Sequence, residues 1–145
     1  MNYSPNVKQV NWPPWMLMDY QQSQKYLLSK PFVNLDYPFG ADVEVFKVKG
    51  KMFATLALGK MGKDQGSEPG DWWMNLKCDP HEALILRDIF PAVIPGYHMN
   101  KQHWNTVILN GTIPPGEIQR MIDNSFNLVV SKMNKKAQQS ILLHL

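Results

Sequence analysis

The side chains best suited to chemistry lie close together between Pro95 and Val107, in the sequence PGYHMNKQHWNTV. The aromatic rings could stack on bases or on a ligand, and the amide and ammonium groups could donate hydrogen bonds to phosphates or base edges. The same side chains could instead cover the edge of the core and satisfy open backbone groups of a loop. Both interpretations stay open from the residues alone, which are Tyr97, His98, Asn100, Lys101, Gln102, His103 and Trp104.

A second group of candidate residues lies in a predicted β-hairpin from Val43 to Leu58. Lys47 and Lys49 share one face of the first strand, and Lys51 begins the returning strand, which places a small basic patch near the turn at Gly50. A β-ribbon with lysines can follow phosphates or enter a groove. Lysines also protect exposed strand edges from aggregation, and the residues alone favour that interpretation.

Several catalytic and cofactor motifs are missing from the sequence. It contains no G-x-x-x-x-G-K-[ST], no G-x-G-x-x-G and no G-x-S-x-G. The four histidines are scattered, and none pairs with the single cysteine, Cys78, at the spacing of a zinc site. We therefore predict no cofactor, no metal and no enzymatic activity. A general-base role for His98 or His103 ranks last, because the sequence places no nucleophile or acid beside either one.

Length and composition predict an ordinary globular protein. The chain has 145 residues, of which 44% are hydrophobic and 19% charged. One cysteine excludes an intrachain disulfide, and the N-terminus lacks the features of a signal peptide, so a reducing, cytoplasmic location is expected. No apolar run is long enough to span a bilayer. The net charge of +3 and the pI near 9.0 permit contact with nucleic acid without requiring it.

The elements that must position these residues follow from periodicity and from punctuation by proline. Residues 1–16 read as an irregular arm with Trp12 and Trp15, and residues 17–145 as a single domain. The chain should then form a helix, three strands, a helix, two strands and a last long helix, which is an α+β order with a largely antiparallel sheet. The expected ranges are a helix at Leu17–Lys30, the hairpin, a surface loop at Gly59–Asp71, a strand at Trp72–Cys78, a helix capped by Asp79, strands at 92–97 and 104–109, and helices at about Pro115–Met133 and the C-terminus.

Four segments together resemble the MmcQ/YjbR family of small bacterial proteins: PFGADVEVFKVKGKMFA, NLKCDPHEALILR, PGYHMNKQHWNTVILNG and IDNSFNLVV. The resemblance runs from about Pro38 to Met133. It implies a CyaY-like α+β fold, with an antiparallel sheet and helices packed on one face. The longer loop at Gly59–Asp71 and the N-terminal arm depart from the family pattern.

The resemblance also implies DNA binding through a "double-wing" pair of hairpins. The wings would correspond to Val43–Leu58 and Pro95–Leu109. On this interpretation DNA is the partner, and no membrane is involved. The alternative is a small-molecule- or protein-binding domain with a pocket beside Tyr97, His98 and Trp104. The predicted nucleic-acid-binding residues are Lys47, Lys49, Lys51, Tyr97, His98, Asn100, Lys101, His103 and Trp104.

Overall fold

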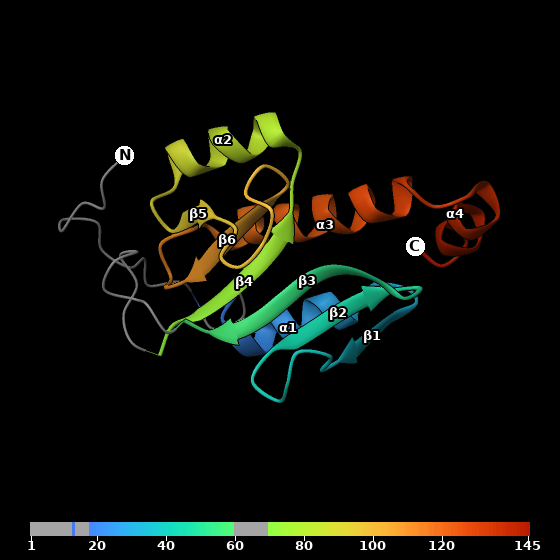
Figure 1. The fold of residues 1–145 in the computed structure, drawn as a ribbon, viewed down its shortest axis with the longest axis horizontal. Helices are drawn as coiled ribbons and strands as arrows, with labels where there is room; N and C mark the ends of the chain where they lie inside the picture. The colour runs from blue at the N-terminus through green and yellow to red at the C-terminus, as the bar shows by residue number, and fades with distance from the viewer. Residues whose placement is uncertain (1–12, 14–17, 60–69) are drawn as a thin grey trace.

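The computed structural model describes residues 13, 18–59 and 70–145 (Figure 1). Within these ranges the chain forms ten elements, which follow an α+β order as predicted. They are α1 (Tyr20–Leu28), β1 (Val33–Asp36), β2 (Glu44–Val48), β3 (Lys51–Leu58), β4 (Trp72–Lys77), α2 (Pro80–Ile89), β5 (Val93–Pro95), β6 (Trp104–Leu109), α3 (Pro115–Ser131) and α4 (Lys135–Leu142). The arm at residues 1–12 and 14–16 and most of the predicted surface loop, residues 60–69, lie outside the described residues.

The strands form one open sheet in the order β1-β2-β3-β4-β6-β5, and every neighbouring pair is antiparallel. The predicted hairpin is confirmed as β2 and β3, joined by a turn at Lys49 and Gly50. Strand β1 was not predicted: it has only four residues and forms by pairing along β2, with Val33 opposite Val48. Its existence depends on a partner strand rather than on a local signal.

Helices α1, α2 and α3 pack on one face of the sheet, and the opposite face is turned toward the viewer in Figure 1. Helix α3, predicted at about Pro115–Met133, buries one face whose residues follow helical spacing, with Ile118, Met121, Ile122 and Val129 among them. The serine on that face, Ser125, is fully buried, and it accepts from Lys77 N (2.9 Å) and donates to Phe53 O (2.5 Å). It therefore links β3 and β4 to α3 near the irregularity in the β2–β3 pairing.

Helix α2 begins at its predicted cap. Asp79 accepts from His81 N and Glu82 N at the start of α2, which has Pro80 in its first turn. Glu82 turns outward to pair with Arg120 of α3 at 2.6 Å. Helix α1 begins three residues later than predicted, because Asp19 caps it at Gln22 N.

The acidic residue that begins β2 has a structural role on the helix side of the sheet. Glu44 alternates onto the same face of β2 as Phe46 and Val48, and all three residues are buried. Tyr20 of α1 donates to Glu44 Oε2 at 2.5 Å, and Gln24 donates to Oε1 at 3.0 Å. Burial and the nearby carboxylate raise the pKa of Tyr20 to about 12. These bonds satisfy a carboxylate that would otherwise be costly to bury.

No helix among the described residues is long and apolar enough to cross a bilayer.

Candidate ligand-binding site

The connection between β5 and β6, residues 96–103, folds back over the open face of the sheet. It leaves β5 at Gly96, whose amide donates to Trp104 O at 3.0 Å. A Cβ atom on Gly96 would lie 2.8 Å from Trp104 Cβ and 2.9 Å from Trp104 O, so this close approach requires glycine. The connection thus continues across the face that the helices leave uncovered (Figure 1).

Three polar side chains on neighbouring strands lie on the face of the sheet that this connection covers. Thr55 of β3 lies opposite Asn75 of β4, and Asn75 lies opposite Thr106 of β6. All three therefore occupy the same face in one row, which we call the polar row. Thr106 donates to Asn75 Oδ1 and accepts from Tyr97 N (2.9 Å), while Asn75 Nδ2 donates to Tyr97 O (3.3 Å). Two members of the polar row thus hold the backbone of Tyr97 in place.

Arg87 of α2 holds the other end of the connection. Its Nε donates to Asn105 Oδ1 at 2.7 Å, and its Nη2 donates to Lys101 O and, at 3.4 Å, to Trp104 O. Lys101 in turn donates from Nζ to Gly96 O at 2.8 Å. Arg87 and Lys101 therefore hold the two ends of the connection together, and their donor groups stabilise the fold.

Other predicted site residues in this stretch also make contacts within the chain. The Asn100 side chain accepts from Gln102 N (2.9 Å) and His103 N (3.3 Å), and the ring of Trp104 is buried. His103 is exposed, and its carbonyl accepts from Cys78 N at 2.8 Å. In the part of the chain that the structure describes, Asn100 and Trp104 therefore both make contacts that stabilise the fold.

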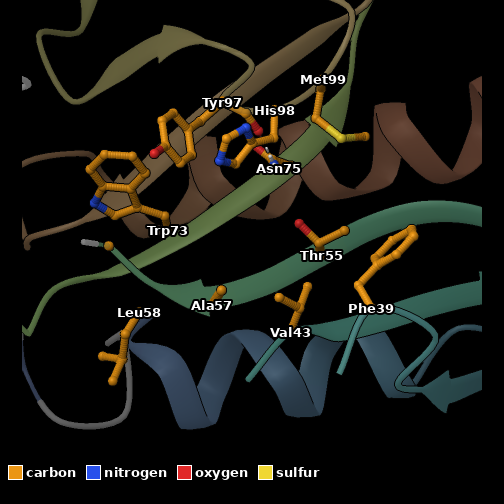
Figure 2. Close-up of a pocket in the computed structure, with 11 residues that line it drawn as sticks. Phe39, Val43, Thr55, Ala57, Leu58, Trp73, Asn75, Tyr97, His98 and Met99 are labelled. Carbon is orange, nitrogen blue, oxygen red and sulfur yellow. Dashed lines mark hydrogen bonds between the residues drawn. The ribbon is translucent and has the colours of Figure 1, made fainter. Parts of the chain in front are cut away.

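Tyr97 and His98 face a cavity on the open side of the sheet. Figure 2 shows Tyr97, His98 and Met99 along one side of this cavity, and Phe39 and Val43 along the other. The cavity has a volume of about 360 Å³ and lies on strands β3 and β4. Its described lining residues are Phe39, Val43, Thr55, Ala57, Leu58, Gly59, Trp73, Asn75, Tyr97, His98 and Met99.

The aromatic walls of the cavity are arranged by contacts between neighbouring rings. Trp73 and Tyr97 meet edge to face, with centroids 5.3 Å apart and planes at 85°. The His98 ring lies 4.0 Å from the Tyr97 ring, at a backbone φ of 60°. A positive φ is uncommon outside glycine and often marks a functional position. In the described structure no hydrogen bond reaches the His98 ring, which leaves it available to a ligand.

Thr55, the third member of the polar row, is the unusual group in the cavity. Its side chain is 5% exposed, and Figure 2 shows it directed into the cavity. Unlike Asn75 and Thr106, its hydroxyl has no hydrogen-bond partner among the described residues. A buried hydroxyl without a partner costs about 1–3 kcal/mol. A threonine at this point therefore calls for a partner from outside the chain.

The hairpin lysines lie away from the cavity and are partly engaged. Lys47 pairs with Asp36 of β1 at 3.0 Å, and its hydrogen bond holds the pKa of that carboxyl below its usual value. Lys49, in the turn, lies 4.5 Å above the Phe32 ring. Lys51 is exposed at the start of β3. Two of the three lysines are therefore held against the β1 edge of the sheet, whereas Lys101 is engaged at Gly96.

The sequence signal for the cavity is weak. Thr55 and Asn75 each interrupt an apolar strand, in FATLAL and WMNLK, and a polar residue inside a buried strand is the signal that could have identified them. Phe39 and Trp73 give no local signal for a site. Sequence reasoning found Tyr97 and His98 and missed the floor and opposite wall.

The described residues contain no group of three or more His, Cys, Asp or Glu side chains placed to hold a metal. Cys78 is buried, and burial together with the nearby Glu82 and Asp79 carboxylates raises the pKa of its thiol to about 11. The thiol is thus kept in its protonated, unreactive form at neutral pH.

The fold and site define an α+β domain with helices on one face of an antiparallel sheet and a cavity on the other. Residues 28–128 match the model of the YjbR family, and the chain belongs to that family. It is 34% identical over 122 residues to Escherichia coli O157:H7 "Uncharacterized protein YbdF", covering 84% of this chain and 93% of that one. Escherichia coli K12 "Uncharacterized protein YjbR" is 26% identical over 125 residues, covering 86% and 98%.

Solved structures agree with this assignment. Deinococcus radiodurans protein DR2400, with a DUF419 domain, superposes with a TM-score of 0.72 at 29% identity, covering 87% of this chain and 89% of that one. A Pseudomonas syringae protein superposes with a TM-score of 0.67 at 33% identity, covering 77% and 98%. The predicted α+β architecture and family are confirmed, and the names of these relatives give no activity.

Proposed function

We propose that this protein is a binding domain that takes a small molecule into the cavity on the open face of its sheet. The observation that carries the proposal is the buried Thr55 hydroxyl, which lacks a partner among the described residues, whereas both of its neighbours in the polar row are hydrogen-bonded to the chain. A bound ligand would supply the missing hydrogen bond and remove the cost of burying that group.

The shape and lining of the cavity support this function. A volume of about 360 Å³ lies within the range of small-molecule sites, and its walls are mostly apolar with a few converging polar groups. Phe39 at the rim is 67% exposed, and Leu58 is 48% exposed. A ligand in the cavity would cover part of this apolar surface, which favours binding.

Thermal-shift screening of neutral and charged metabolites tests the proposal. A ligand present at 100 times its Kd adds about 2.7 kcal/mol to stability, and a domain of this size should then melt roughly 5–10 °C higher. Ala57→Leu places a larger side chain on the cavity floor and should abolish every such shift while the protein stays folded. Ala137→Leu, the same change on the distant α4, should leave the shifts intact. The proposal fails if no compound shifts the wild type, or if the hits survive Ala57→Leu.

DNA binding through the hairpin lysines stays a prediction from the family resemblance, and the exposed Lys51 and the net charge of +3 support it. Each phosphate contact releases counterions, so such binding should weaken steeply with salt. A duplex titration at two salt concentrations, with Lys49→Ala/Lys51→Ala as the variant, measures this. Binding that is absent at low salt or unaffected by the variant contradicts the prediction.

A further inference from the structure

We propose that the ligand of this cavity is an uncharged, planar heterocycle that presents a carbonyl oxygen, which is the chemistry of a nucleobase. This inference rests on the proposed small-molecule function and adds the class of ligand. Three separate features of the cavity support it: the charge of its lining, the free donors on its floor and the arrangement of its walls.

The described lining offers no ion-pair partner for a charged group at the floor of the cavity. Among the described lining residues there is no lysine, arginine, aspartate or glutamate. The nearby ammonium of Lys101 is already bonded to Gly96 O. A charge buried without a partner is strongly unfavourable, so the part of the ligand that enters is neutral.

The floor offers hydrogen-bond donors side by side. Asn75 uses Oδ1 to accept from Thr106 and one N–H to bond Tyr97 O, which leaves its second N–H without a partner among the described groups. Thr55 lies directly opposite Asn75 on the next strand, so their Cβ atoms are about 4.5–5.5 Å apart. A carbonyl oxygen has two lone pairs and can accept from both groups at once. The floor therefore selects a ligand with a carbonyl.

The walls favour a flat ring. Figure 2 shows Tyr97, His98 and Met99 facing Phe39 and Val43 across the floor formed by Thr55 and Ala57. Trp73 closes one end, with its ring perpendicular to that of Tyr97. A planar heterocycle placed between the two sides can stack on aromatic faces while its carbonyl edge reaches the floor, which is how bases are bound on stacking platforms.

Two sources share this chemistry, a free base or nucleoside and an unpaired base of a single strand. Binding is measured by calorimetry with uracil, hypoxanthine, uridine and a single-stranded oligouridine. We expect uracil or hypoxanthine to bind. Displacement of the free base by the oligouridine indicates a base within a strand, and no displacement indicates the free base or nucleoside; both outcomes support the proposal.

Three matched compounds test the three properties of the ligand. Orotate adds a carboxylate to uracil, dihydrouracil loses the planar ring, and pyrimidine loses the carbonyls. Each should bind at least about tenfold more weakly than uracil, the loss expected for one hydrogen bond or one stacked face. Equal binding of any one of them overturns the corresponding part of the proposal.

Thr55→Val removes the hydroxyl and keeps the shape of the side chain, while Thr55→Ser keeps the hydroxyl. Thr55→Val should weaken uracil binding about tenfold or more and raise the melting temperature, because an unsatisfied buried group is gone. Thr55→Ser should bind within a few fold of wild type. Equal binding by wild type and Thr55→Val overturns the proposal. If metabolites of another class bind and Ala57→Leu abolishes that binding, the small-molecule function is supported and the nucleobase assignment is wrong. No binding by any compound removes both.

Discussion

The two connections that the family resemblance treats as equivalent wings are built in opposite ways. The β2–β3 connection is a two-residue turn in which Lys49 and Gly50 both have positive φ, the geometry of a type I′ hairpin. The β5–β6 connection spans residues 96–103 and folds back onto the sheet. The first continues the ladder of its strands, and the second leaves it to cover a face.

The difference follows from how each connection satisfies its backbone. A tight turn leaves few polar groups unpaired, and among the described residues this one makes a single backbone bond outside the hairpin, from Lys49 N to Phe32 O at 3.2 Å. A longer connection must find partners, and this one finds them in Asn75 and Thr106 on the sheet and in Arg87 of α2. Asn75 lies directly opposite Thr55 on the sheet, so the longer connection forms one wall of a cavity above Thr55, and the tight turn forms none. Length of connection, rather than its charge, separates the two regions.

The largest effect should come from adding one methyl group to each connection. Gly96→Ala forces a contact under 3 Å with Trp104, including its backbone, and should cost about 3 kcal/mol of unfolding free energy. Gly50→Ala has open space and only the strain of its positive φ, so it should cost about 1 kcal/mol. Urea denaturation of both variants measures the difference. Equal losses would mean that the β5–β6 connection yields as easily as the turn.

A smaller effect should come from removing a cationic side chain at each connection. Arg87→Met takes away donors to Asn105, Lys101 and Trp104 and leaves a buried amide oxygen without its partner, at a cost of about 2 kcal/mol. It should also weaken ligand binding, because the cavity wall loses its restraint. Lys51→Met, at the exposed start of β3, should change the unfolding free energy by no more than about 0.5 kcal/mol. If chemical denaturation shows comparable losses of unfolding free energy for the two variants, the two connections do not differ in the way described.

The smallest effect concerns the pairing of Lys47 with Asp36. Because the folded pKa of Asp36 is lowered, its contribution to stability is present above the ordinary aspartate value of about 3.9 and is lost as the pH falls through the lowered value. The stability difference between wild type and Lys47→Met should therefore be present at neutral pH and shrink in acid. Both groups are partly exposed, so salt should reduce it as well. Asp36→Asn is the matched control, and it should remove the same dependence. A stability difference between wild type and Lys47→Met that grows in acid would contradict a lowered pKa of Asp36.

The fold was predictable wherever its signals are local. Asp79 and Pro80 indicate the start of α2, and the helical spacing from Ile118 to Val129 indicates the buried side of α3. Alternation of residues between the two faces of a strand indicates the hairpin. Strand β1 was missed because four residues carry too little pattern, and pairing with β2 stabilises it. Of the residues that line the candidate cavity, the sequence had singled out Tyr97 and His98, while Phe39, Trp73 and Thr55 come from three other segments.

By itself, the sequence determined the α+β class and the Asp79 cap of α2, and it singled out the stretch around Tyr97 as a candidate site. These depend on interactions between residues near one another in the chain. Tertiary structure alone decided that Thr55, Asn75 and Thr106 form one row, and that the described residues satisfy only part of its hydrogen-bonding capacity. That outcome depends on strand register and on the path of a connection across the sheet, because a hydrogen-bond partner is defined by proximity in space rather than by spacing in sequence.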